Sequence, residues 1–412
     1  MRIGIFTDTY PPYINGVSTS VHMLQRGLEK KGHKVYIVTV NSEGMKYNFE
    51  SENIIRIPGI PIGIYDYRLT GIYPLKPLAT IKSWNLDVIH SHTEFGVGSF
   101  ARIIAKQYNI PLVHTYHTMY EDYIHYITKG YFDKSSKKVV EYLTNFYCEK
   151  TADALIVPGE KPKALFKDKY GMEKEVYVVP TGIEIERFYR ENVNQDEVNI
   201  LKEKHNITKD DFVLMYVGRM ALEKNLGFLI ECQKELLKKK MNLKLIFVGD
   251  GPDADKLKED VKKAKLEDKI IFTGKIPWVE VAKYYQMTAV FVTASNTETQ
   301  GLTIMEAMSA GAVTVCRNDE AFRETITDKI DGFFFDDKKE YMDAITLLYN
   351  DRELLARMAA KARSNAELHS TDHFADSVLK IYRKVKRNKK ERYHTLKQIG
   401  RKIGIIKKKE EK

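Results

Sequence analysis

Residues 295–306 read SNTETQGLTIME, and the organisation of the whole chain can be worked out from this stretch. An apolar run at 289–294 precedes it, and a helical pattern beginning at Glu306 follows it. The order is therefore a strand, a polar loop with one glycine, and a helix N-terminus. Such a loop points backbone N–H groups and the positive end of a helix dipole at the edge of a sheet, where a phosphate can bind.

Two carboxylates bracket this loop. Glu298 and Glu306 are eight residues apart, which would be about 12 Å along a helix axis, close to the length of a nucleotide sugar from ribose to sugar ring. Carboxylates accept hydrogen bonds from vicinal hydroxyls, so one could hold a ribose and the other a hexose. The same two acids also fit a structural interpretation, as a capping acid and a first-turn acid of one helix.

Apolar runs alternate with amphipathic stretches on both sides of this loop, which predicts α/β domains with parallel sheets. We expect strands in the first half at 2–7, 34–40, 54–58, 87–92, 112–117, 154–157 and 176–180. In the second half we expect them at 212–217, 243–248, 270–273, 289–294, 312–316 and 332–335, with helices between them. Two doubly wound, Rossmann-like domains follow, and the crevice between them, at the carboxyl ends of the strands, is the expected ligand site.

Length and composition agree with two domains. The chain has 412 residues, and we place a first domain at 1–182, a second at 183–380 and a tail at 381–412. The three cysteines are widely spaced, which favours a reducing compartment over a disulfide framework or a structural zinc. The chain starts directly with a strand pattern and has no run of 18 apolar residues, so we expect neither a secretory signal nor a membrane span.

The positive charge is concentrated in the tail. Residues 381–412 contain 14 Lys or Arg and 3 Asp or Glu, whereas the whole chain has a net charge of +10, so the remainder is close to neutral. Leu396, Ile399, Ile403 and Ile406 are three or four apart among basic residues. This pattern predicts a basic amphipathic helix that binds an anionic membrane surface. A basic tail is also compatible with a nucleic-acid-binding protein, although the near-neutral body carries no nucleic-acid-binding motif.

Several other loops follow predicted strands. Arg219 and Lys224 follow the strand at 212–217 and could neutralise a diphosphate, or they could be ordinary surface cations. Gly16 opens a helix after the first strand and could allow close approach to a phosphate, or simply allow the turn. The loop at 248–252 suits a plain turn, and Ile276, in the loop at 274–277, could present backbone groups to a nucleobase. The sequence contains no Walker loop, and no DxD pair at a strand end that would hold a metal on a diphosphate.

The first half contains two further groups of interest. Histidines gather at two strand ends, and His117 would face the interdomain cleft, where it could bind a sugar hydroxyl. Tyrosines at 116, 120, 123 and 126 share one helix face, which suits either a core stripe or a half-wet surface. Residues 60–82 are apolar with scattered cations, as in an interfacial helix or loop.

Taken together, these motifs resemble the retaining glycosyltransferases of family 4. The resemblance rests on residues 15–17, Gly218-Arg219 with residues 223–225, residues 248–252, and Glu298 to Glu306 followed by 307–308 and Gly311. It runs through both halves in the right order. It implies the GT-B fold, with two Rossmann-like domains and an interdomain cleft. The family often has two glycines in its first loop, where this chain has Asn15 and Gly16.

The resemblance also implies roles. Arg219 and Lys224 would hold the donor diphosphate, Glu306 the ribose and Glu298 the donor sugar. His117 matches a histidine that contacts the donor sugar and assists the reaction, so the resemblance makes His117 and Glu298 the catalytic pair. The remaining donor-binding residues would be Gly16, Ile276, Gly301, Leu302 and Thr303. No metal or other cofactor is expected, because protein cations would neutralise the diphosphate.

Within the family, residues 90–94, 116–123 and 297–302 look most like bacterial diacylglycerol glucosyltransferases. That likeness implies transfer of glucose from UDP-glucose to the 3-hydroxyl of diacylglycerol, with retention, at the cytoplasmic surface of the membrane. Anionic lipids would be partners through the tail and residues 60–82. The alternatives are another sugar, a soluble acceptor, or a nucleotide-sugar epimerase of the same fold.

Overall fold

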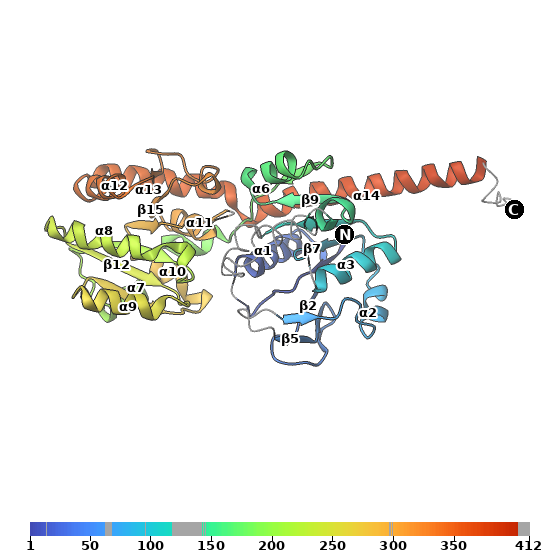
Figure 1. The fold of residues 1–412 in the computed structure, drawn as a ribbon, viewed down its shortest axis with the longest axis horizontal. Helices are drawn as coiled ribbons and strands as arrows, with labels where there is room; N and C mark the ends of the chain where they lie inside the picture. Colours follow the sequence, from blue (N-terminus) through green and yellow to red (C-terminus); the bar gives the residue numbers. More distant parts are fainter. Residues whose placement is uncertain are drawn as a thin grey trace. The chain divides into compact units, whose positions relative to one another are not determined.

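The structure is a computed structural model. It describes residues 1–402 apart from 14, 62–67, 95, 118–141, 143, 145, 296, 297 and 299, and from 391 onward it describes side chains only at 391 and 395. The chain forms two compact units (Figure 1). The first contains Met1–Pro158, Pro162–Val179 and Phe374–Lys412, and the second contains Gly159–Lys161 and Pro180–His373.

The first unit is built on an eight-stranded sheet with the order β10-β9-β8-β7-β1-β2-β4-β3. Only β3 pairs antiparallel, at the edge of the sheet. In chain order the elements are β1 (Arg2–Phe6), α1 (Gly16–Lys30), β2 (Lys34–Val40), β3 (Asn48–Ser51), β4 (Ile54–Ile57), β5 (Gly59–Pro61), β6 (Arg68–Thr70), α2 (Leu78–Ser83), β7 (Val88–Ser91), α3 (Gly96–Gln107), β8 (Leu112–Thr115), η1 (Phe146–Lys150), β9 (Ala154–Val157), α6 (Glu160–Ala164), η2 (Leu165–Lys169) and β10 (Val176–Val178).

The second unit contains a six-stranded parallel sheet with the order β13-β12-β11-β14-β15-β16. Its elements are η3 (Ile185–Phe188), η4 (Arg190–Asn192), α7 (Gln195–Lys204), β11 (Phe212–Val217), η5 (Leu222–Lys224), α8 (Leu226–Lys238), β12 (Leu243–Val248), α9 (Ala254–Lys263), β13 (Ile270–Gly274), η6 (Trp278–Glu280), α10 (Val281–Tyr285), β14 (Val290–Thr293), α11 (Leu302–Ser309), β15 (Val313–Arg317), η7 (Glu320–Phe322), β16 (Gly332–Phe335), α12 (Lys338–Asn350), α13 (Arg352–Ala366) and η8 (Glu367–His369). The helix α14 (Thr371–Lys402) follows.

Each sheet is buried on both faces, which is why its strands are continuous apolar runs. On the first sheet, Ile3 and Ile5 of β1 pack with α1 and α14, whereas Phe6 packs on the opposite face with α3. On the second sheet, one core cluster includes α8, α9 and α12, and the other includes α10, α11 and α13. The predicted α/β class with two Rossmann-like, doubly wound domains is therefore confirmed.

The strand order places a topological switch point in each sheet. In the second sheet the order reverses between β11 and β14, and in the first between β1 and β7. Ligands of open α/β sheets bind beyond the carboxyl ends of the strands at such points. The loop after β11 carries Arg219 and Lys224, and the loop after β14 carries Glu298, so the topology brings these three predicted residues to one switch point.

The unit boundaries differ from those that we expected at the C-terminal end. The second unit ends at His373, rather than at residue 380, and α14 belongs to the first unit from Phe374 onward. Its apolar face, including Phe374, Val378, Tyr382 and Val385, is buried in the first unit's core. Lys384 and Lys389 pair with Glu175 and Asp153, at 2.6 and 3.4 Å, and Lys386 pairs with Asp87. The first part of the predicted tail is therefore a core helix.

Within residues 60–82, where we expected an interfacial helix or loop, β5 and β6 pair antiparallel and α2 follows, and residues 62–67 lie outside the described residues. Of the four tyrosines at 116, 120, 123 and 126, Tyr116 is buried, and the other three lie outside the described residues. Within the described parts of the chain, none of the helices has both the length and the apolar character needed to cross a bilayer.

Candidate active site

Glycines allow the loops after β11 and β12 to pack backbone against backbone. A Cβ on Gly249 would lie 2.0 Å from the carbonyl oxygen of Gly218, and one on Gly251 would lie 2.3 Å from that of Met220. The Gly218 and Met220 N–H groups donate to the carbonyls of Val248 and Asp250, at 2.9 and 3.0 Å. The loop at 248–252, which we interpreted as a plain turn, therefore also supports the loop that carries Arg219.

The loop after β14 is held in place at its end, where Gln300 and Gly301 precede α11. The buried Gln300 side chain accepts a hydrogen bond from the Thr181 N–H (2.8 Å) and donates one to the Thr181 carbonyl (3.0 Å). Gly301 then caps α11 with a φ of 77°, in the left-handed region that favours glycine, and a Cβ there would lie 2.7 Å from the Phe322 ring. Leu302 and Thr303 begin α11, so their N–H groups lie at its positive end.

Lys224 and Glu298 meet directly. The Lys224 ammonium lies 2.5 Å from a Glu298 carboxylate oxygen and 3.3 Å from the Ser295 hydroxyl. Only 14% of the Lys224 side chain and 23% of the Glu298 side chain are exposed. The polar end of the β14 strand and the loop after β11 therefore form one partly dry, charged site, which joins two predicted residues 74 positions apart.

Arg219 belongs to the same group of charges. Its guanidinium forms an ion pair with the buried carboxylate of Glu223. Tyr216 at the end of β11 donates its hydroxyl proton to the Arg219 carbonyl at 3.0 Å. Burial, together with the nearby charges of Glu298 and Glu223, raises the pKa of this phenol well above its usual value, whereas Arg219 acts in the opposite direction. Both predicted cations thus lie near carboxylates at the switch point of the second sheet.

Glu306 is a buried carboxyl on α11, with 8% of its surface exposed. Burial raises its pKa to about 7, and the 2.8 Å hydrogen bond that the Tyr285 hydroxyl donates to its Oε2 partly offsets this rise, as does the charge of Arg187. The Tyr285 hydroxyl oxygen also lies 3.2 Å from the Thr303 carbonyl oxygen, so Tyr285 contacts both Glu306 and the first turn of its helix. The interpretation of Glu306 as a first-turn acid is wrong, because α11 begins at Leu302 and Glu306 lies beyond its first turn.

The two remaining residues of the predicted donor set lie in different units. Gly16 starts α1, where nothing lies within 4 Å of an added Cβ, and the side chain of Asn15 caps the helix by accepting from the Ser18 N–H at 2.8 Å. Asn15, which occupies the place of a family glycine, therefore has its own structural function. Ile276 follows β13 and packs, partly buried, on a core cluster of the second unit.

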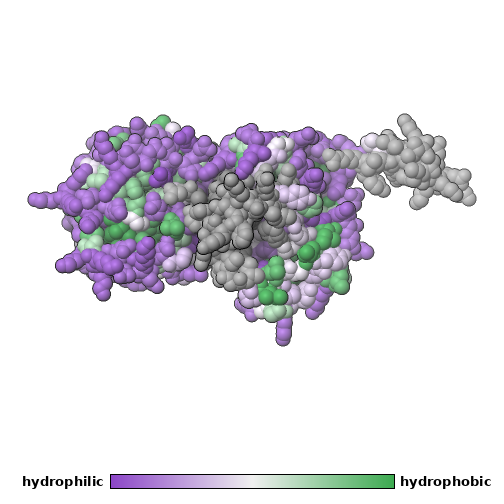
Figure 2. All heavy atoms as spheres, viewed as in Figure 1, coloured by the Kyte–Doolittle hydropathy of each residue, from purple (hydrophilic) through white to green (hydrophobic). Residues whose placement is uncertain are grey.

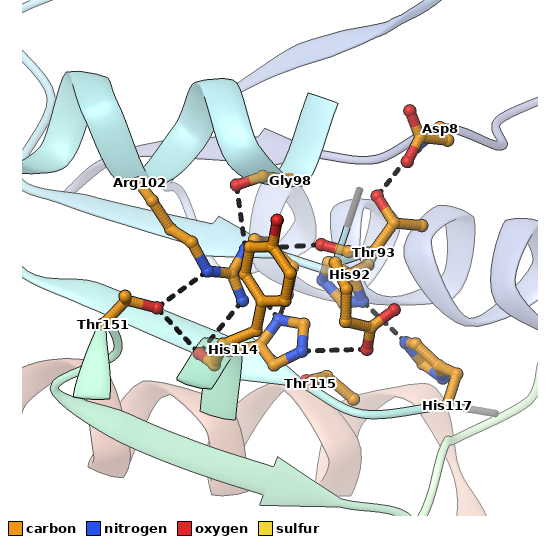
Figure 3. A network of polar contacts seen from close by, with 12 residues as sticks. Asp8, His92, Thr93, Gly98, Arg102, His114, Thr115, His117 and Thr151 are labelled. Carbon is orange, nitrogen blue, oxygen red and sulfur yellow. Dashed lines mark hydrogen bonds and ion pairs between the residues drawn. The ribbon is translucent and has the colours of Figure 1, made fainter. Parts of the chain in front are cut away.

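His117 lies in a cluster of buried polar groups in the first unit (Figure 3). Its Nε2 is 2.9 Å from Nδ1 of His92, and the two rings stack with centroids 5.2 Å apart. Burial lowers the pKa of His117 to about 4, so the ring is neutral at physiological pH. His90 and His114 complete the histidine cluster, and His114 Nε2 lies 3.1 Å from the Glu94 carboxylate.

Arg102 connects the segments of the chain that surround this cluster. Its guanidinium donates to the Gly98 carbonyl at 2.8 Å and to the Thr151 hydroxyl at 2.9 Å, and it lies 4.7 Å from the centre of the Tyr147 ring. Asp8, at the end of β1, accepts from the Val97 N–H at 3.0 Å, and burial raises its pKa to about 6. The carboxyl ends of β1, β7 and β8 therefore carry a dense set of buried ionisable groups at the switch point of the first sheet.

Three residues of the site were missed by sequence reasoning: Tyr216, Tyr285 and Gln300. Tyr216 is the second-last residue of a predicted strand and was counted only as part of it. Tyr285 belongs to a short helix with no distinctive spacing. Gln300 lies inside the quoted loop, but its partner, the backbone of Thr181, is 119 residues away, and no local pattern indicates that contact.

Comparison with known proteins covers both units. A family model described as "Glycosyltransferase Family 4" matches residues 14–187, and one described as "Glycosyl transferases group 1" matches residues 197–365. The chain is 37% identical to an alpha-monoglucosyldiacylglycerol synthase of Streptococcus pneumoniae, over 84% of this chain and 77% of that protein. It is 35% identical to the alpha-monoglucosyldiacylglycerol synthase of Acholeplasma laidlawii, over 93% of this chain and 96% of that protein.

The fold is similar to those of solved glycosyltransferase structures. The Anabaena protein HepE, crystallised in complex with UDP and glucose, superposes with a TM-score of 0.70 at 15% identity, over 92% of this chain and 98% of that one. The described elements thus follow one fold along nearly the whole chain.

Proposed function

Because the chain belongs to glycosyltransferase family 4 and is a sugar-transferring enzyme with the GT-B fold, we propose that it moves glucose from UDP-glucose to the 3-hydroxyl of diacylglycerol, with retention. One observation carries this proposal. The 35% identity to the Acholeplasma laidlawii alpha-monoglucosyldiacylglycerol synthase extends over 96% of that protein, so both units are included.

The charges at the second unit's switch point suit a diphosphate leaving group. In the proposed reaction, Arg219, Lys224 and the N–H groups of Leu302 and Thr303 stabilise the negative charge that grows on UDP as the sugar leaves. Lys224 is held in place by Glu298 and Ser295, so little reorganisation of its side chain is needed as the sugar leaves. Protein cations would therefore provide the charge neutralisation, and we propose a reaction that requires no metal.

The two acids would bind different parts of the donor. Glu306 lies beyond the first turn of α11 and is shielded from water, which suits hydrogen bonds from ribose hydroxyls. Glu298 lies beside Lys224, close to the proposed diphosphate site, and would bind hexose hydroxyls. Gly16, Ile276 and Gly301 would approach the donor through their backbones. His117 would contact the donor sugar, and the acceptor hydroxyl would attack from the face that UDP leaves.

An acceptor with two fatty-acyl chains needs a protein that works at a lipid surface. Exposed apolar side chains gather on strands β5 and β6 and on the segment before α2, and include Ile60, Leu69, Ile72 and Leu75. Lys76, which is exposed beside them, lies 5.4 Å from the centre of the Tyr47 ring. In Figure 2, hydrophobic surface is visible over the region where Figure 1 draws β5. We propose that this surface and the last part of the basic tail bind the cytoplasmic face of the membrane, with anionic lipids as partners and no nucleic acid.

Product analysis tests the function. Purified protein is incubated with vesicles that contain diacylglycerol and with UDP-glucose, UDP-galactose or UDP-N-acetylglucosamine, and the lipids are analysed by mass spectrometry and by NMR of the anomeric proton. We expect an α-linked glucosyl lipid from UDP-glucose alone. Equal or better product from another sugar would overturn the donor assignment, and donor consumption that ignores diacylglycerol would overturn the acceptor assignment.

A further inference from the structure

His92 contacts the proposed catalytic histidine and is almost fully enclosed. It follows the last residue of β7, its backbone N–H donates to the Phe6 carbonyl at 2.9 Å, and only 2% of the residue is exposed. Its Nδ1 lies 2.9 Å from Nε2 of His117. Its other ring nitrogen, Nε2, is buried and has no hydrogen-bond partner among the described residues. Figure 3 shows His92 and His117 facing each other across this contact.

The hydrogen bond between the two rings allows two proton arrangements, since each neutral imidazole carries one N–H. If His117 donated from Nε2, His92 would keep its own proton on Nε2, which would be a buried donor without an acceptor. If His92 donates from Nδ1, its Nε2 is only an acceptor with an unused lone pair. Buried donors without acceptors are the rarer of these two situations in folded proteins.

The position of the His92 ring is fixed from its other side. The His90 ring lies against it, with centroids 4.1 Å apart. His90 is itself held at both nitrogens, by the Tyr382 hydroxyl at 2.6 Å and by the Thr115 hydroxyl at 2.7 Å. His92 therefore cannot turn its free nitrogen toward His117 without displacing an anchored neighbour.

We propose that His92 is a positioning residue that holds His117 in the tautomer with its proton on Nδ1. In that tautomer Nε2 of His117 accepts from His92, and Nδ1–H remains available as a donor toward a hydroxyl of the sugar. A neutral imidazole with its proton on Nδ1 and with Nε2 occupied by His92 cannot remove a proton from the hydroxyl of the substrate that receives the sugar. His117 then acts by orienting and stabilising the transferred sugar. This inference rests on the proposed function for the role of His117, but not for the tautomer.

The tautomer can be measured without any substrate. In protein labelled with 15N-histidine, two-bond 1H–15N correlation spectra separate the two neutral tautomers, and the His117 signals are identified by their loss in His117→Gln. We expect the Nδ1–H pattern for His117 in the unmodified protein. We expect the Nε2–H pattern, which free imidazole prefers in water, in His92→Leu.

Two amide variants separate positioning from packing. In His92→Asn the amide nitrogen takes the place of Nδ1 and can still donate to His117, whereas in His92→Gln it takes the place of Nε2. We expect His92→Asn to retain the Nδ1–H pattern and to keep kcat within about threefold. We expect His92→Gln and His92→Leu to lose about 100-fold in kcat, with a smaller change in KM for UDP-glucose, because a misdirected donor acts mainly on the transition state.

Phe100→Leu is the packing control, because it removes a buried ring from the core of the first unit while leaving the His90, His92 and His117 rings in place. Its thermal midpoint should fall as far as that of His92→Leu, while the His117 pattern stays unchanged. An Nε2–H pattern for His117 in the unmodified protein, or equal kcat losses in the Asn and Gln variants, would overturn the inference. If the spectra agree but no sugar is transferred, the proposed function fails and the tautomer assignment stands.

Discussion

Glu298 and Glu306 differ in how far each carboxyl is removed from water, and this difference separates their proposed roles. Glu298 is partly exposed and is neutralised by Lys224. Glu306 is buried, its side-chain partner among the described residues is the Tyr285 hydroxyl, and its pKa is raised to about 7. A carboxyl of this kind is ready to lose its proton when ribose hydroxyls arrive to donate hydrogen bonds.

Donor binding should therefore depend on pH. Ribose hydroxyls stabilise the charged form of Glu306, so we expect the affinity for UDP to rise as the pH increases from about 5 to about 7 and to level off above that. The folding stability of the free protein changes with pH in the opposite direction. Because the pKa of Glu306 is raised in the folded protein, the stability that its protonated form contributes is present below the unfolded pKa and is lost as the pH rises through about 7. Calorimetry of UDP binding across this range measures the effect.

Glu306→Gln supplies the control, since the amide keeps the size but does not titrate. Its UDP affinity should be lower and should vary far less between pH 5 and 7. Glu298→Ala should chiefly lower turnover and leave UDP affinity within about threefold, because Glu298 is assigned to the sugar. Unchanged donor kinetics in both variants would remove these acids from the site.

The cation at Lys224 can be tested against a matched lysine on the adjacent helix. Lys224→Met should lower kcat/KM by about 100-fold, because one preorganised charge at the leaving group is lost. Lys239→Met makes the same change at an exposed residue at the end of α8, and should stay within about twofold. Steady-state rates with UDP-glucose distinguish the two. Equal losses would indicate a general charge effect rather than a site.

At the scale of the element, the buried apolar strands could be predicted closely, whereas the short exposed strands could not. The strands at 34–40, 154–157, 212–217, 243–248 and 332–335 were predicted with the bounds that the structure has. These are apolar runs buried on two faces, so local pattern and tertiary environment agree. β3, β5 and β6 are three or four residues long and largely exposed, and no alternation marks them.

The candidate site was partly predictable for a related reason. The topology of a doubly wound sheet brings loops after β11 and β14 together, so Arg219, Lys224 and Glu298 could be grouped from strand order alone. The positions of Tyr285 beside Glu306 and of Gln300 beside Thr181 depend on tertiary packing, and a single sequence carries no local trace of either contact.

The crossing of the loops after β11 and β12 gives a test at this scale. Gly249→Ala would place a methyl group 2.0 Å from a backbone oxygen, at a φ of 132°, so the loops must separate. We expect the thermal midpoint to fall by about 5 °C or more, together with weaker donor binding, because Arg219 lies on the displaced loop. Gly227→Ala is the matched control. It has open space in α8, and it should leave the midpoint unchanged or slightly raised.

At the scale of the whole molecule, the basic residues of α14 divide into two groups. Lys384, Lys386 and Lys389 pair with acids of the first unit and are used to seat the helix. The basic residues after 391 are therefore the ones that we assign to the membrane. Basic residues near an anionic surface contribute about 1 kcal/mol each, and the effect weakens with salt.

Deletion of residues 391–412 should accordingly weaken co-sedimentation with anionic vesicles, while the fold and donor binding persist. Replacement of Leu69 and Leu75 by serine should weaken binding to anionic and neutral vesicles alike, because the exposed apolar surface does not depend on lipid charge. Unchanged sedimentation of the deletion variant at moderate salt would contradict the role of the tail.

The path of α14 also determines the order in which the protein can mature on the ribosome. Residues 374–385 complete a core whose other members include Ile3, Leu24 and Ile37, so the ribosome must synthesise the entire second unit before the core of the first can close. One apolar face of the N-terminal sheet therefore lacks α14 while nearly 200 further residues are synthesised. The second unit is a continuous segment apart from Gly159–Lys161, and it can fold first. During biosynthesis we therefore expect the N-terminal half to expose an apolar face for longer than the second unit does.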